Sequence, residues 1–98
     1  MKHEFIFSGQ TTTQWDKDER YNEMFITATK NYHRDLVVVK GYVFLNDILS
    51  SLGLENTKQG QIEGWTKALQ MEIVKIEGIN AFTLIFNTDG EILDVFKN

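Results

Sequence analysis

Two histidines and their acidic neighbours are the residues whose chemistry could be catalytic. His33 stands in the stretch YHRD (residues 32–35), which resembles the catalytic loop of protein kinases, but the sequence has no glycine-rich loop or metal-binding partner to match it. We therefore expect His33 on the polar flank of a helix, solvated or paired with an acid. His3 and Glu4 fit none of the spaced motifs that hold zinc. The sequence predicts no catalytic residue, no metal site and no cofactor, and hence a protein that is not an enzyme.

Two glycine-containing stretches resemble ligand-binding loops only in part. NTDGE (87–91) lacks the alternating oxygen ligands and the closing glutamate of a calcium loop, and its Asp89-Gly90 pair favours a hairpin turn. Gly60 and Gly64 lack the spacing of a phosphate-binding loop. We expect Gly64, directly before Trp65, to let the backbone approach the core closely.

The stretch GYVFLNDILSSLGLENTKQGQIEGW (41–65) has the outline of a DNA-reading unit, two short helices around a glycine turn. Lys58, Gln59 and Gln61 could face a groove, but Glu55 and Glu63 stand among them. The formal net charge is -4, and the ten Lys and Arg residues are scattered along the chain. Because lysine and arginine supply most of the affinity for phosphates, direct nucleic-acid binding is disfavoured and a basic partner, such as a nucleic-acid-binding protein, is preferred.

An acidic cluster and two tryptophans complete the candidates for partner binding. The acidic stretch DKDE (16–19) either imitates the phosphates of a nucleic acid or stabilises a helix N-terminus by interacting with the helix dipole. Each tryptophan either fills the core or forms a contact surface, and the sequence leaves both alternatives open. The predicted partner-binding residues are Trp15, Asp16, Asp18, Glu19, Lys58, Gln59, Gln61 and Trp65.

The composition indicates one small folded domain spanning residues 1–98. A chain of 98 residues supports a single core, and 42% hydrophobic and 12% aromatic residues are typical of a globular protein. The sequence has no cysteine, which fits a reducing compartment, and its first ten residues lack the apolar core of a signal peptide. We expect a soluble cytoplasmic protein that does not enter the membrane.

Hydrophobic spacing predicts an α+β fold. HEFIFS (3–8) alternates like a half-buried strand, and a long helix should run from about Thr13, or from a turn later, to a stop at Gly41. A short helix capped by Asn46 and ended by Gly53, and a second one after Thr57, should follow. Residues 69–78, 81–87 and 91–96 read as a three-stranded antiparallel meander packed on the long helix. The stripe expected to face the sheet comprises Tyr21, Met24, Phe25, Ala28, Tyr32, Leu36 and Val39.

The chain also resembles an uncharacterised family of small proteins from phages and mobile elements of Gram-positive bacteria. The resemblance is carried by RYNEMFITATKNYHRDL, by the 41–65 stretch and by LIFNTDGEILDVF, and covers most of residues 20 to 96. Members carry a longer acid- and glycine-rich segment after the Gly-Trp pair, whereas TKALQMEIVKIEGIN is short here. The resemblance implies no reaction or substrate. It implies a genomic neighbourhood of phage accessory or structural proteins, including inhibitors of bacterial defence systems.

These observations predict a small non-enzymatic protein that binds another macromolecule. The leading hypothesis is a stoichiometric inhibitor of a host defence protein, for example an anti-CRISPR protein acting on a nuclease. The alternative is a phage virion or self-assembling component that pairs through an edge strand, and hence a homo-oligomer. A small DNA-binding regulator is the third hypothesis.

Overall fold

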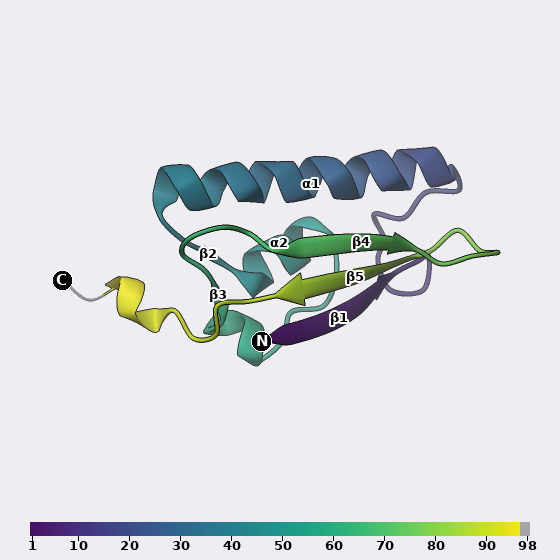
Figure 1. Cartoon of the computed structure of the whole chain (residues 1–98). Coiled ribbons are helices and arrows are strands. Elements are labelled where there is room, and N and C mark those ends of the chain that lie inside the picture. The colour runs from purple at the N-terminus through teal and green to yellow at the C-terminus, as the bar shows by residue number, and fades with distance from the viewer. Residues whose placement is uncertain (97–98) are drawn as a thin grey trace.

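The computed structural model of the protein describes residues 1–96 and has the predicted α+β composition (Figure 1). Two helices and a three-stranded sheet dominate it. The elements in chain order are β1 (Lys2–Phe7), α1 (Glu19–Lys40), β2 (Val43–Phe44), α2 (Leu45–Ser51), the 3-10 turn η1 (Gln59–Gln61), β3 (Gly64–Trp65), β4 (Met71–Lys75), β5 (Phe82–Asn87) and the 3-10 turn η2 (Leu93–Phe96).

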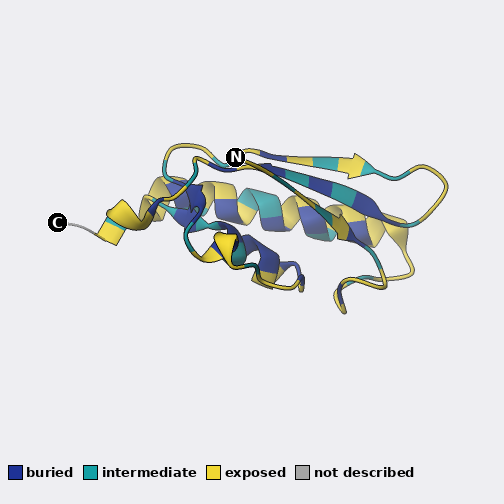
Figure 2. Ribbon diagram, turned by 90° about the horizontal axis from the view of Figure 1, so that it is seen from below, coloured by how far each residue is buried: buried dark blue, intermediate teal, exposed yellow. Residues whose placement is uncertain are grey.

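The main sheet has the order β1-β5-β4 and is antiparallel throughout. In its register Phe5 lies opposite Leu84, which in turn lies opposite Ile73. Side chains alternate across a strand, so Phe7, Leu84 and their neighbours face the helices while alternate residues face solvent. Helices α1 and α2 lie on the same side of the sheet, with α1 next to β4 (Figures 1 and 2).

The predicted strand at 91–96 is wrong, and its place in the sheet is taken by the N-terminal strand β1. After β5 the chain bonds instead to the segment around β3: Asp89 N–H donates to the Gly64 carbonyl (2.8 Å) and Ile92 N–H to the Ile62 carbonyl (2.8 Å). Gly90 has φ +87° but turns the chain toward β3 rather than closing a hairpin. Residues 93–96 then form η2, which stacks Phe96 on Phe44 at 5.8 Å.

Helix α1 ends as predicted and begins later than predicted. Gly41 terminates it with φ +95°, a conformation that glycine adopts without steric cost. Its first turn is capped by Asp18, whose carboxylate accepts from the N–H of Arg20 (2.9 Å). The residues before Asp18 are held out of the helix because the side-chain amide of Asn22 bonds both the N–H and the carbonyl of Asp16 (2.8 Å each).

The side of α1 that faces the core is not the predicted apolar stripe. The buried residues are Asn22, Ile26, Thr29, His33 and Val37. Of the predicted stripe, Phe25 and Leu36 are half-buried against the core and the remainder are exposed. Polar residues can face inward because each is bonded: Thr29 Oγ1 donates to the Phe25 carbonyl (2.9 Å) and His33 Nδ1 to the Thr29 carbonyl (2.8 Å). The expectation of a solvated His33 is therefore wrong.

Between α1 and β3 the chain forms one short helix and one 3-10 turn in place of two helices. The N-terminus of α2 is capped by Asp47, whose carboxylate accepts from the Phe44 N–H (3.0 Å), and not by Asn46 as predicted. The Asn46 amide instead joins α2 to the next loop, because it bonds both the N–H and the carbonyl of Thr57 (3.0 and 2.9 Å). Gly53 ends this region with φ +73°. The core that results is drawn in dark blue in Figure 2.

Candidate functional site

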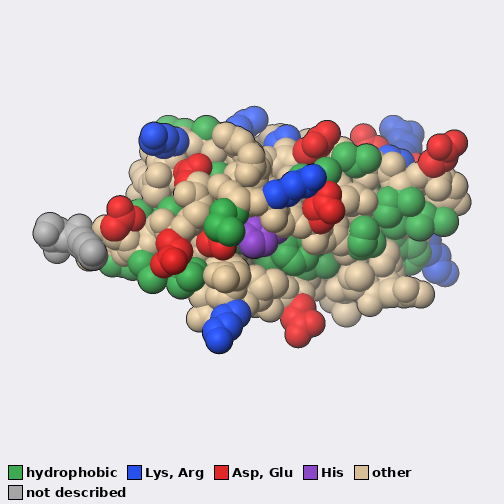
Figure 3. Space-filling view, turned by 60° about the horizontal axis from the view of Figure 1, so that its bottom comes forward, with side chains coloured by type: hydrophobic (Ala, Val, Ile, Leu, Met, Phe, Trp, Pro, Cys, Tyr) green, Lys and Arg blue, Asp and Glu red, His purple; other side chains and the backbone are tan. Residues whose placement is uncertain are grey.

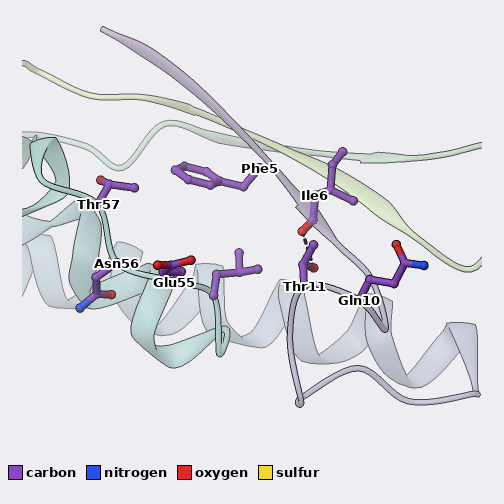
Figure 4. Close-up of a pocket in the computed structure, with 8 residues that line it drawn as sticks. Phe5, Ile6, Gln10, Thr11, Glu55, Asn56 and Thr57 are labelled. Carbon is purple, nitrogen blue, oxygen red and sulfur yellow. Dashed lines mark hydrogen bonds between the residues drawn. The ribbon is translucent and has the colours of Figure 1, made fainter.

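A groove separates strand β1 from the loop that follows α2. Its volume is about 430 Å³, and the sticks in Figure 4 show Phe5 of β1 extending toward Thr57 of the loop, whereas the side chain of Ile6 points away from the loop. Gln10, Thr11 and Leu54 complete the lining. The segments on the two sides are brought together by the core, because Phe5 and Leu54 belong to the same apolar cluster. The groove thus has an apolar floor and a polar rim.

Strand β1 turns an unpaired edge toward solvent beside this groove. Thr88 N–H donates to the Met1 carbonyl (2.8 Å), so residues 1, 3, 5 and 7 direct their backbone groups to the β5 side and residues 2, 4 and 6 direct theirs away. The Ile6 carbonyl already accepts from the Thr11 hydroxyl (2.7 Å), as the dashed line in Figure 4 marks. Within residues 1–96 the backbone N–H and carbonyl of Glu4 have no partner on that side. A free strand edge of this kind is a template for another chain.

A buried carboxylate fixes the N-terminal end of β1 to the rest of the fold. Glu63 is nearly fully buried, and its Oε1 accepts from His3 Nε2 (2.7 Å) and from the Thr88 hydroxyl (2.7 Å). A carboxylate oxygen only accepts, so both partners must donate. Burial raises the pKa of Glu63, but the hydrogen bonds from His3 and Thr88 outweigh burial and hold this pKa below its ordinary value of 4.5. Glu63 therefore serves to position β1.

Replacing Glu63 with glutamine should lower the free energy of unfolding at pH 7 by about 1–3 kcal/mol, because charge-assisted hydrogen bonds are lost. A carboxylate with a lowered folded-state pKa contributes stability that is present above pH 4.5 and is lost as the pH falls through the folded-state pKa. The difference between the native protein and Glu63→Gln should therefore shrink below pH 4.5 in urea titrations.

Glu91 supplies the matched control, since it pairs with Glu63 through the backbone yet has an exposed side chain. Glu91→Gln should change stability by less than about 0.5 kcal/mol at every pH. An equal effect of the two substitutions would show that the Glu63 contact carries no special stability.

The residues predicted from sequence to bind a partner do not form one site. Lys58, Gln59 and Gln61 are exposed at η1, whereas the acidic residues lie at the start of α1, well apart from η1 in Figure 1. Asp18 caps α1 and Glu19 pairs with Lys75 (3.2 Å), so both have a local structural role.

The two tryptophans differ in position. Trp65 is entirely buried, and its Nε1 donates to the Asn87 carbonyl (2.8 Å). Its side chain is therefore not available to a partner in this fold. Trp15 is half-buried, and its Nε1 donates to the Asn80 carbonyl (2.8 Å).

Charged side chains of both signs are interspersed over the face in Figure 3, and Lys and Arg do not gather there into one patch.

Among residues 1–96, no helix is long and apolar enough to cross a membrane. Histidine, aspartate and glutamate side chains in this part of the chain form no group of three or more that could hold a metal ion.

The fold and the groove define a small α+β protein with an open strand edge beside a groove that has an apolar floor. The chain belongs to a family of unknown function (DUF6353), whose model matches residues 2–96. No curated protein and no solved structure matches the chain.

Proposed function

We propose that the protein is a non-enzymatic protein-binding protein, and that it captures an extended segment of its partner in the groove beside β1. The observation that carries the proposal is the unpaired backbone of Glu4 at the groove's edge. An extended segment laid there would add a fourth strand to the sheet through main-chain hydrogen bonds.

The groove also supports a preference for particular side chains in the segment. In an added strand alternate side chains point to the same side, so every second side chain of the segment would enter the groove over Phe5 and Leu54. Glu55 is exposed at the rim, and the chain carries a formal net charge of -4. These features favour a segment in which apolar residues alternate with lysine or arginine.

The experiment is a selection of random peptides displayed on phage against the full chain, followed by affinity measurement on the enriched peptides. We expect enrichment of sequences that alternate apolar and basic residues. Glu4→Pro should weaken binding at least tenfold, because it removes the free N–H on the groove side while the hydrogen bonds of β1 to β5 come from the neighbouring residues. Glu55→Lys should also weaken it.

Two matched variants control for side-chain loss and for overall charge. Glu4→Ala retains the backbone N–H, and Glu77→Lys changes an exposed acid in the β4–β5 turn. Both should bind within about twofold of the native protein, a difference well below 1 kcal/mol. Failure to enrich any peptide, or equal loss in Glu4→Ala and Glu4→Pro, would contradict strand addition at β1.

Within this class, the narrower hypothesis is stoichiometric inhibition of a host defence protein such as a CRISPR nuclease. Its support is the resemblance to phage and mobile-element proteins together with the acidic charge, which suits a basic nucleic-acid-binding target. A pull-down from host lysate should then recover a basic defence protein in a one-to-one complex. Recovery of the chain alone would count against this target, but not against peptide binding.

A further inference from the structure

The outer side of α1 carries an apolar stripe that nothing in the fold covers. We define the outer stripe as Tyr21, Met24, Ala28, Tyr32, Val38 and Val39. Its five large side chains are between 53% and 83% exposed. A surface helix ordinarily places polar residues away from the core, so a contiguous apolar stripe marks an interaction surface.

The stripe has the length and spacing of a helix-pairing seam. Tyr21, Met24, Ala28, Tyr32 and Val39 follow one another at intervals of three, four and seven residues, which keeps them on one side of the helix, and Val38 flanks them. The 22 residues of α1 extend for roughly 33 Å at 1.5 Å per residue. Figure 1 shows α1 along the outside of the molecule, with no other element over its outer surface.

The two ends of α1 differ in charge when the three residues before the helix are counted with its N-terminal end. Residues 16–23 contain four acidic and two basic residues, and residues 30–40 contain three basic and one acidic residue. Residues 16–23 thus have a net charge of -2, and residues 30–40 have a net charge of +2. Two such helices side by side attract one another when they run antiparallel and repel when they run parallel, and the helix dipoles favour the same orientation.

We propose that two copies of this chain associate through their outer stripes, with the two α1 helices antiparallel. A second copy fits because its own stripe supplies both the apolar surface and the opposite order of charges. Matching the two ends of the stripe places Tyr21 of one copy beside Val39 of the other. The proposal does not rest on the groove at β1, because the two surfaces share no residue.

The exposed area indicates a weak dimer. The large side chains of the stripe offer on the order of 500 Å² per copy, hence about 1,000 Å² in total, which is at the lower limit for a specific interface. We expect a dissociation constant on the order of 10 µM.

Analytical ultracentrifugation tests the association. The native chain should change from monomer to dimer across the range of about 1 to 100 µM. Met24→Glu and Tyr32→Glu should each weaken the dimer at least tenfold without changing the melting temperature, because both side chains are already exposed. Ile79→Glu places the same charge on an exposed apolar residue outside the stripe and should leave the dimer unchanged. A native chain that stays monomeric, or a dimer that survives both substitutions, would overturn the proposal.

Disulfide cross-linking tests the orientation, since the natural sequence has no cysteine. In an antiparallel pair, Tyr21→Cys and Val39→Cys should each form no covalent dimer under mild oxidation, whereas an equal mixture of the two should form a disulfide-linked dimer. A parallel pair would give the reverse result, because each variant would then cross-link with itself. Larger species that persist in Met24→Glu would instead point to pairing through strand edges.

Discussion

Replacing Gly64 with alanine should destabilise the protein by about 4 kcal/mol, because the added methyl group has no space. A Cβ at this position would lie 2.0 Å from the Val43 carbonyl oxygen and 2.8 Å from Phe44 Cα. Both are backbone atoms of β2, the strand that pairs with β3 at this point. Relief of the clash would require the two strands to separate.

Gly78→Ala is the matched control for this substitution. Gly78 has φ +86° and open space around its Cα, so alanine there should cost only the strain of a left-handed conformation, about 1 kcal/mol. Urea denaturation followed by circular dichroism measures both variants. If Gly64→Ala cost no more than Gly78→Ala, the close contact of β3 with β2 would be shown to be unimportant for stability.

Replacing Trp65 with alanine should cost about 3–5 kcal/mol, which approaches the whole stability of a domain of this size. The indole is completely buried and contacts Phe86 with a ring separation of 6.1 Å. Its loss would leave a cavity between β3 and the sheet and would also deprive the Asn87 carbonyl of its hydrogen bond. The variant should be largely unfolded at 37 °C by circular dichroism.

Two further substitutions separate burial from residue type. Trp65→Phe retains an aromatic ring and should lose about half as much stability as Trp65→Ala. Trp15→Ala removes a half-buried indole and should cost less than Trp65→Ala. Equal losses at positions 15 and 65 would show that the degree of burial does not govern these contributions.

The sequence predicted the elements whose signals are local. Gly41 and the apolar spacing located the end of α1, alternation located β1, β4 and β5, and the Gly-Trp pair indicated a close approach to the core. The start of α1 was misplaced because the bonds from Asn22 to Asp16 give no signal in helix propensity. The strand predicted at 91–96 was wrong because β1 pairs with β5 across nearly the whole chain.

The apolar stripe of α1 was assigned to the core because hydrophobic spacing shows that a helix has an apolar side. It does not show whether that side faces the core or the solvent. The actual core-facing side contains Asn22, Thr29 and His33, whose polarity is accommodated by hydrogen bonds that only the folded chain provides. The groove could not be predicted for a related reason. Phe5 and the 54–57 loop are distant in sequence, and nothing local in either segment indicates that they meet.

The central position of β5 has a consequence for biosynthesis. Both other strands of the main sheet pair with β5, and β5 ends at Asn87. No hydrogen bond of this sheet can form until β5 has left the ribosome, and translation of residues 8–87 takes roughly 4–16 s at ordinary rates. During that interval β1, which carries Phe5 and Phe7, has no strand to pair with, although α1 is already complete. As an unpaired strand, β1 can then pair with another chain.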